Sequence, residues 1–297
     1  MIDTLCFSGG GVKGISFLGA LKYLKENEMF KPEEIKTLVG TSVGAILALL
    51  LAVDYSIEEL IDFVLKFDFS KFKLETDSTK LLLNFGIDSG DKFVILLNTL
   101  LKEKLGVEDL TFMELYNKTN KNLKILATNY TLSKSEVFNY ETTPDTDVIL
   151  ATRMSFSVPF LFTPIEYKNC YYIDGGVSCN FGLFCCNNKT TLGFAIDLAK
   201  ENNELNSLFV FLQNMCKISI NCNSLNFDSY LGVEEKYQIL KIQCRQEDAF
   251  EFTIKTEQIK RLIEDGSESS KKYYSNFVIN DIMKNLINKI SSSVTEK

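Results

Sequence analysis

The chain of 297 residues contains no histidine. Imidazole is the side chain best suited to act as a general base near neutral pH, and it is the commonest metal ligand. Its absence excludes a Ser-His-Asp triad, a Cys-His pair and a histidine-rich metal site within this chain. A serine or cysteine nucleophile here therefore needs a carboxylate or a lysine as its base.

Positive charge is also in short supply. Acidic residues outnumber basic ones by 39 to 32, only three of the basic residues are arginines, and the formal net charge is −7. A protein that binds nucleic acid needs a basic face, and arginine is the side chain best suited to contact phosphates and bases. We therefore expect no nucleic acid among the partners.

The cysteines form no recognisable metal or disulfide pattern. None of the eight stands in a C-x-x-C spacing, and Cys185 and Cys186 are adjacent and cannot form an ordinary local bridge. The D-x-[DN]-x-[DN]-G calcium pattern is missing as well. We expect reduced thiols, no metal and no cofactor.

Long hydrophobic runs are missing too. The longest is Val43 to Val53, 11 residues against the roughly 18 that a membrane-spanning helix needs. Its helical part is apolar on all sides, which predicts a helix buried between a sheet and another layer. Met1 to Gly11 lacks the features of a secretory signal. We expect a cytoplasmic, intracellular protein, with peripheral contact to a membrane surface left open.

Apolar spacing predicts alternating strands and helices. Strands are predicted at residues 4–7, 37–39, 123–130, 136–139, 165–167, 170–173, 192–198 and 238–244. Helices are predicted at residues 12–27, 45–53, 56–67, 88–106, 111–119, 143–154, 204–220 and 257–289, the last with a break at residues 266–270. This alternation predicts an α/β fold with a largely parallel sheet.

Some helix starts carry their own signals. Ser56 and Thr111 each stand three residues before a Glu, which is the capping-box pattern. Asp88 or Ser89 is predicted to cap the helix that follows them. Thr143, with a proline behind it, predicts the start of another helix.

Three glycine-marked sites each follow a predicted strand directly, which is where ligands bind in open α/β sheets. The first is Gly9-Gly10-Gly11-Val12-Lys13-Gly14. Backbone N–H groups in such a turn suit an anion or a developing oxyanion. The stretch also fits the G-x-G-x-x-G dinucleotide fingerprint, but no acidic residue ends the next strand to hold a ribose.

The second site is Gly40-Thr41-Ser42-Val43-Gly44, between a predicted strand and an apolar helix. That setting is typical of a nucleophile elbow, in which the flanking glycines avoid collisions and the N–H after the serine faces the oxygen it attacks. The alternative is that Ser42 merely caps the helix.

The third site is Asp174-Gly175-Gly176, at the end of a strand that can neighbour the strand bearing Ser42. A carboxylate there can serve as the base that a serine needs in the absence of imidazole. Asp-Gly is also a common turn dipeptide, so the alternative is a simple turn.

The order of these motifs resembles that of the patatin-like phospholipases, acyl hydrolases with a Ser-Asp dyad and no histidine. Arg153 to Pro159 is similar to the Ser-x-x-x-Pro segment of that family. The resemblance implies a three-layer sandwich with a central, mostly parallel sheet. It also implies a catalytic domain at 4–187, a C-terminal part of the same fold at 188–290 and a frayed tail at 291–297.

The resemblance further implies roles for the motif residues. Ser42 would be the nucleophile, Asp174 the base, and Gly10, Gly11 and Val43 the oxyanion donors. Gly9, Gly14, Gly40, Gly44, Gly175 and Gly176 would be the motif glycines that allow close backbone approach. Lys13 would either hold a lipid phosphate or solvate the loop. A working base also needs partial desolvation to raise the pKa of the Asp.

The function expected on this basis is hydrolysis of carboxylic esters in phospholipids or other acyl lipids. Two alternatives stay open: a catalytically idle lipid-binding protein of the same fold, and a nucleotide-dependent enzyme using the first glycine turn. Residues 67–85 mix phenylalanine with lysine, which is typical of segments that dock on membranes as well as of core segments. Pro159 to Phe162 is interpreted as core more readily than as an interface.

Overall fold

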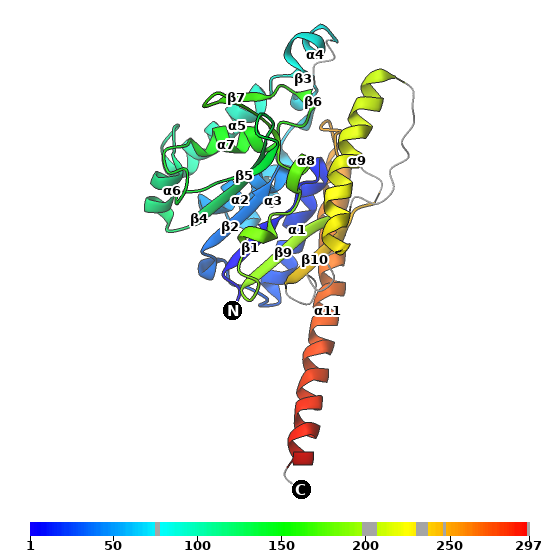
Figure 1. Ribbon diagram of the computed structural model, residues 1–297. Helices are drawn as coiled ribbons and strands as arrows, with labels where there is room; N and C mark the ends of the chain where they lie inside the picture. Colours follow the sequence, from blue (N-terminus) through cyan, green and yellow to red (C-terminus); the bar gives the residue numbers. More distant parts are fainter. Residues whose placement is uncertain (75–77, 198–206, 230–236, 246–247, 296–297) are drawn as a thin grey trace.

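A computed structural model describes residues 1–74, 78–197, 207–229, 237–245 and 248–295. Its centre is a sheet in the order β10-β9-β1-β2-β4-β8-β7, with β5 also paired to β4 (Figure 1). The strands of this sheet are β1 (Thr4–Phe7), β2 (Thr37–Thr41), β4 (Asn122–Asn129), β5 (Lys134–Phe138), β7 (Ile165–Tyr167), β8 (Cys170–Asp174), β9 (Thr191–Asp197) and β10 (Gln238–Gln243). A separate two-stranded sheet pairs β3 (Gly86–Asp88) with β6 (Phe160–Phe162).

Helices surround the central sheet. They are α1 (Ser16–Glu26), α2 (Val43–Ala52), α3 (Ile57–Lys66), α4 (Ser78–Asn84), α5 (Asp91–Leu105), α6 (Phe112–Thr119), α7 (Val148–Ser155), α8 (Gly176–Cys179), α9 (Leu208–Ser229) and α11 (Thr256–Thr295). Short 3₁₀ turns are η1 (Gly11–Ile15), η2 (Pro32–Glu34), η3 (Phe69–Phe72) and η4 (Leu183–Cys185). The predicted α/β sandwich with a mostly parallel sheet is confirmed.

The strand directions place Asp174 differently from the prediction. β10, β9, β1, β2 and β4 are parallel to one another, whereas β5 and β8 are antiparallel to β4. The expectation that β8 could neighbour β2 is wrong, because β4 lies between them. Since Ala127 of β4 pairs with Asp174 and the adjacent Leu126 pairs with Thr41, Asp174 still arrives where β2 ends.

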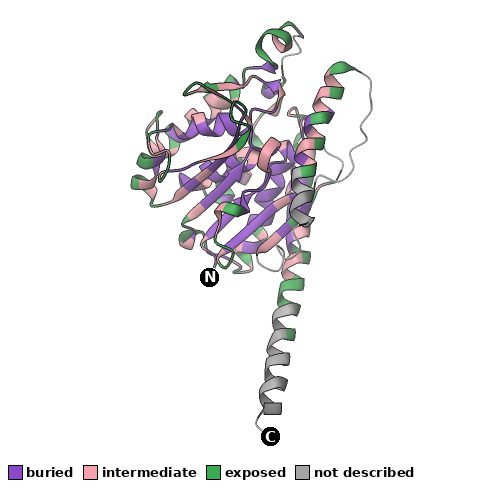
Figure 2. Ribbon diagram, in the orientation of Figure 1, coloured by how far each residue is buried: buried purple, intermediate pink, exposed green. Residues whose placement is uncertain are grey.

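Alternating side chains of the strands divide the interior into two cores. In β1, Leu5 and Phe7 pack into the larger core and Cys6 into the smaller one on the other face. The helix α2 is largely buried, as predicted, and so are the central strands β1, β2, β4 and β9 (Figure 2). Within the residues that the structure describes, no helix has the length and apolar character needed to cross a bilayer.

Some of the predicted helix starts are correct and others are wrong. The Ser56 and Thr111 capping boxes are confirmed. The helix expected from Asp88 starts later, with Gly90 as its N-cap, because the Asp88 carboxylate accepts the Gly90 N–H at 2.7 Å.

The helix expected from Thr143 also starts later. Thr143 donates its hydroxyl to the Asn139 carbonyl at 3.0 Å and so closes a turn. Asp147 then caps α7 by accepting the N–H of Leu150 at 2.7 Å. The stronger carboxylate cap decides where the helix begins.

The helix α11 runs without the predicted break at residues 266–270. Gly266 instead packs against α1, where an added Cβ would collide with the Ser16 carbonyl oxygen. Gly19 of α1 faces the Ile263 carbonyl in the same way, so the two helices touch backbone to backbone. The helix also includes residues 291–295, which were expected to belong to a frayed tail. Residues 296–297 of that tail lie outside the described residues, and so do residue 198 of a predicted strand and residues 204–206 of a predicted helix.

This contact reverses the usual effect of removing a helical glycine. Intrinsic propensity alone makes Ala about 1 kcal/mol better than Gly in a helix. We expect Gly266→Ala instead to lower the free energy of unfolding by about 1–2 kcal/mol, because overpacking outweighs propensity. Urea unfolding measures this. Asn276→Ala, at an exposed position of the same helix, should be neutral or stabilising, and equal behaviour of the two variants would contradict the packing argument.

Candidate active site

Ser42 occupies a sharp turn between β2 and α2. Its φ of 55° and ψ of −123° are rare for any residue other than glycine, so the position is strained. An added Cβ at Gly40 would collide with the Gly44 backbone, and one at Gly44 would meet the Phe7 carbonyl oxygen at 2.6 Å. Ser42 stands at the N-cap of α2, but its side chain makes no capping hydrogen bond.

Asp174 ends β8 with its side chain buried, 1% exposed. Its Oδ1 accepts the Gly176 N–H at 2.7 Å, whereas Oδ2 is buried without a well-aligned donor among the described residues. Burial raises the pKa of this carboxyl to about 6, and hydrogen bonding from the Ser42 hydroxyl and the Gly176 N–H opposes the rise. The sequence-predicted nucleophile and base are therefore neighbours in space.

The segment after α7 holds both residues. Ser155 Oγ accepts the Ser42 N–H at 2.8 Å, and the Ser155 carbonyl accepts the Gly175 N–H at 3.1 Å. The Ser157 carbonyl accepts the Asp174 N–H at 2.9 Å. The Ser-x-x-x-Pro pattern marks this segment in the sequence, but it does not reveal that Ser155 positions the strained turn.

Arg153, in the last turn of α7, holds the same segment in place. Its guanidinium is buried and donates to the carbonyls of Ser89 at 2.8 Å and Thr163 at 3.0 Å, and to the Ser157 hydroxyl. Burial lowers the pKa of this Arg to about 10. The arginine thus ties the ends of β3 and β6 to the segment that carries Ser155.

The glycine loop after β1 faces Ser42. An added Cβ at Gly9 would lie 3.3 Å from Ser42 Cβ, and the Gly9 N–H donates to the Asn180 carbonyl at 3.1 Å. Gly11 has a φ of 55°, which favours glycine. The N–H groups of Gly10 and Gly11 have no acceptor in the part of the chain that the structure describes.

Val43, the first residue of α2, adds another donor. Its N–H also lacks an acceptor among the described residues, as expected in the first turn of a helix. Gly14 packs against the Val43 side chain and brings the loop close to this helix end. A helix N-terminus favours negative charge, so the arrangement suits a developing oxyanion.

A pocket of about 30 Å³ joins the loop to Ser42 and Asp174. That volume has room for one or two water molecules. It suits a reacting group and leaves no room for a dinucleotide. Among the described residues no three Cys, Asp or Glu side chains are grouped so that they could bind a metal ion.

The basic side chain beside this pocket is not the one that sequence reasoning selected. Lys13 is buried and lines neither this pocket nor the larger cavity, which argues against contact with a lipid phosphate. Lys217 of α9 lines the pocket instead, 3.0 Å from Asp248. No local sequence signal distinguishes Lys217, because α9 meets the site only through the tertiary fold.

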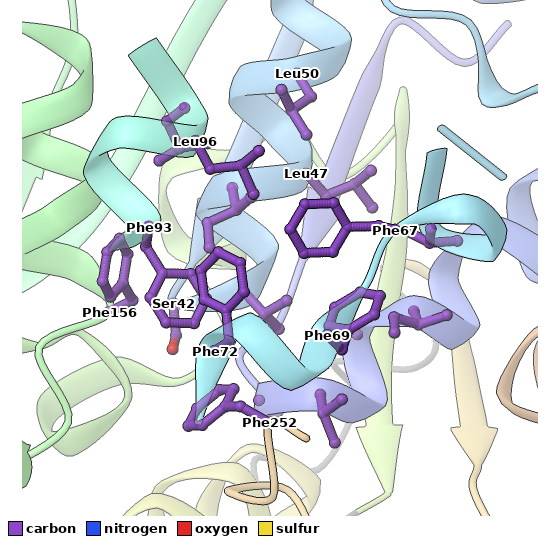
Figure 3. Close-up of a pocket in the computed structure, with 18 of the residues that line it drawn as sticks. Ser42, Leu47, Leu50, Phe67, Phe69, Phe72, Phe93, Leu96, Phe156 and Phe252 are labelled. Carbon is purple, nitrogen blue, oxygen red and sulfur yellow. The ribbon is translucent and has the colours of Figure 1, made fainter. Parts of the chain in front are cut away.

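A larger apolar cavity of about 170 Å³ begins at Ser42 and follows α2 toward Leu50 (Figure 3). Among the described residues, Ser42 carries the only polar side chain in its lining. Phe67, Phe69 and Phe72 line it, which shows that this part of the predicted docking segment faces inward. Phe162 lines it too, from the segment interpreted as core.

A family model and individual relatives both match this chain. The model of the patatin-like phospholipase family matches residues 5–184. The probable lipid hydrolase 463L of Invertebrate iridescent virus 6 is 37% identical over 182 residues, 60% of this chain and 61% of that protein. Uncharacterized protein R571 of Acanthamoeba polyphaga mimivirus is 29% identical over 91% of this chain and 93% of that protein. The chain thus spans about three fifths of the first of these relatives.

Two solved structures share the fold. VipD from Legionella pneumophila superposes with a TM-score of 0.66 at 18% identity, over 93% of this chain and 67% of VipD. The type III effector protein ExoU gives a TM-score of 0.52 at 16% identity, over 93% of this chain and 53% of ExoU. At these identities the likeness concerns the architecture alone.

The buried charge of Asp174 predicts a stability effect with a defined sign. Its pKa is about 6 in the folded chain against 3.8 ordinarily, so the folded state binds more protons between these values and stability falls as pH rises through them. Above pH 6 the charge costs at most about 3 kcal/mol. We expect Asp174→Asn to stabilise the fold at pH 7.5 by about 1–3 kcal/mol.

The same comparison at low pH isolates this cause. Well below pH 3.8, at about pH 2.5, Asp174 is protonated in both states, so the gain from Asp174→Asn should vanish there. Urea unfolding at both pH values is the measurement. Asp62→Asn removes the same charge from an exposed position of α3 and serves as the control. An equal gain at both pH values would refute the assignment.

Proposed function

The chain belongs to the patatin-like phospholipase family, and we propose that it is a lipid acyl hydrolase of the phospholipase A type. The observation that carries the proposal is the position of Ser42. It lies where an apolar cavity meets a small pocket that contains a buried carboxylate. In the proposed complex the acyl chain fills the cavity and the ester carbonyl lies at Ser42. The expected setting is intracellular and peripheral to membranes.

In the proposed mechanism Ser42 Oγ attacks the acyl carbon and its proton passes to Asp174. The N–H groups of Gly10, Gly11 and Val43 stabilise the oxyanion. Asp174 then returns the proton to the departing alcohol, which leaves an acyl-enzyme. Asp174 next removes a proton from water, and the resulting hydroxide attacks the acyl carbon. As the bond to Ser42 breaks, Asp174 returns that proton to Ser42 Oγ, so the fatty acid leaves and both side chains are restored.

The environment of Asp174 supports its role as the base. An ordinary Asp is too weak a base to assist serine efficiently, but a carboxyl with a pKa of about 6 is closer to neutrality and still ionised there. Its Oδ2 has no competing well-aligned donor among the described residues. The base can therefore be directed at the serine hydroxyl.

Ser42→Ala separates the hydrolase from the catalytically idle lipid-binding protein. We expect the variant to lose ester hydrolysis by a factor of at least about 10³ and to lose labelling by a fluorophosphonate, because both need the hydroxyl. A parallel thermal melt checks that the fold is intact. Equal hydrolysis and labelling in parent and variant would exclude the proposed hydrolase activity.

The nucleotide-dependent alternative has a separate test. It predicts that a dinucleotide raises the melting temperature of the protein. We expect no such rise, because the pocket beside the first glycine turn is too small for a dinucleotide.

The cavity predicts a dependence on acyl length. The distance from Ser42 to Leu50 along α2 is about 12 Å, or roughly nine carbons at about 1.3 Å per carbon of an extended chain. Ile46 lines the cavity halfway along this path. We expect Ile46→Phe to lower the ratio of decanoate to butyrate ester hydrolysis at least about tenfold, because the larger ring closes the far half.

The ratio is measured on one protein preparation, so partial unfolding does not affect it. Leu50→Ala, which enlarges the far end, should shift the preference toward longer esters. If neither variant changes the ratio, the acyl chain does not occupy this cavity.

A further inference from the structure

The outward face of α9 is apolar. From Leu208 to Cys222, the exposed positions of this helix are Leu208, Phe211, Met215, Ile218 and Cys222. Their spacing of three and four residues places them in one stripe. The exposed fractions are 73% for Leu208, 44% for Phe211, 51% for Met215 and 46% for Ile218. A surface helix normally presents polar side chains to water, so this stripe is unusual.

The inward face of the same helix contributes to the active site. Lys217, Ile220 and Asn221 line the pocket that contains Ser42 and Asp174. The helix therefore turns Lys217 and Asn221 toward the pocket, whereas every position that it exposes between Leu208 and Cys222 is apolar. Because a helix with side chains is about 10 Å across, the apolar stripe lies within roughly that distance of the catalytic pocket.

The tip of α4 provides a second exposed apolar group. Leu82, Leu83 and Phe85 are 79%, 72% and 67% exposed. α4 contacts β3, β3 pairs with β6, and β6 contacts α9, so one continuous stretch of structure connects the tip to the stripe. α4 and the N-terminal end of α9 both lie at the upper end of the molecule, and the exposed stripe continues from there down α9 (Figures 1 and 2).

We propose that the stripe of α9 and the tip of α4 form a docking face that inserts into the surface of a lipid bilayer. The docking face consists of Leu82, Leu83, Phe85, Leu208, Phe211, Met215 and Ile218. Large exposed apolar patches mark sites that contact other molecules or membranes. This inference rests on the proposed function in one respect: a lipid ester must enter the pocket that α9 covers, and a bilayer is where such esters are concentrated.

The helix α9 has few charged residues, which indicates how it would bind a membrane. Lys217 is the only charged residue between Leu208 and Cys222, and it faces inward against Asp248. Docking by this face therefore depends on insertion of apolar side chains and not on attraction to anionic lipids. It should occur on zwitterionic vesicles and should be insensitive to salt.

The test compares two triple variants that remove the same types of side chain. The first is Phe211→Gln, Met215→Gln and Ile218→Gln on α9. The control is Phe277→Gln, Ile279→Gln and Met283→Gln on the part of α11 that projects away from the docking face (Figure 1). The control residues are 38%, 57% and 53% exposed. Both are made in the Ser42→Ala chain, so vesicle lipids stay intact during co-sedimentation with phosphatidylcholine vesicles.

We expect the α9 variant to partition onto vesicles at least about tenfold more weakly than the Ser42→Ala parent, and the α11 control to stay within about twofold of it. No vesicle binding by the parent, or equal losses in both triple variants, would overturn the proposal. Light scattering without lipid gives a further check. If the parent and the α11 control were dimers and the α9 variant a monomer, the proposal would be overturned, because the face would then join two copies of the chain.

Activity measurements keep the proposal separate from the proposed function. In chains with Ser42 intact, both triple variants should hydrolyse a monomeric, water-soluble ester at the parental rate, while the α9 variant alone loses hydrolysis of vesicle lipids. If the parent cleaves no soluble ester, the proposed function fails, and vesicle binding still decides whether the docking face exists. If the α9 variant keeps full hydrolysis of vesicle lipids, the docking face is refuted.

Discussion

Burial of the Asp174 carboxylate is the interaction on which the rest of the site depends. Its pKa rises to about 6 because water is excluded, and the chain has no imidazole to take over the role of base. A buried charge needs fixed surroundings. The Gly176 N–H and the carbonyls of the Ser155 to Ser157 segment supply them, and the same segment holds the strained turn at Ser42. Asp174 and Ser42, the proposed base and nucleophile, are thus positioned by one short piece of chain.

The two spaces that meet at Ser42 differ in every physical respect. One is apolar and elongated, and the other is smaller, contains Asp174 and Lys217, and is bordered by N–H groups without acceptors among the described residues. The phenylalanines of the cavity come from several separate parts of the chain, from Phe63 in α3 to Phe252 before α11. The N–H groups come from the loop after β1 and the start of α2. Of the described residues that line both spaces, Ser42 alone has a hydroxyl.

Local patterns explain which features could be predicted. Gly40 to Gly44 and the loop at Gly9 to Gly14 are read from neighbouring residues, because sharp turns need glycine at fixed positions. The α/β class follows from periodicity in the same way. The positions of Ser155 and Lys217 at the site could not be predicted. Ser155 contacts Ser42, which is 113 residues away in sequence, and Lys217 reaches the pocket only through the packing of α9.

Two errors about the elements have the same origin. The order of β8 and β4 depends on strand pairing across long sequence separations, which apolar spacing does not encode. Gly266 was taken as a break because glycine weakens helices, yet its missing side chain is what lets α11 touch α1. In both places a tertiary contact overrides the local preference.

The helix α2 divides its surface between two tasks. Val43, Ile46, Leu47 and Leu50 face the acyl cavity, whereas Ala45, Ala48, Leu49 and Ala52 are fully buried in the core. The nucleophile is fixed by the turn before the helix, not by either face. In the proposed hydrolase, substitutions in the first set would change the range of lipids accepted, while the second set preserves the fold. Related chains could therefore differ in the lipids they prefer without any substitution at Ser42 or Asp174.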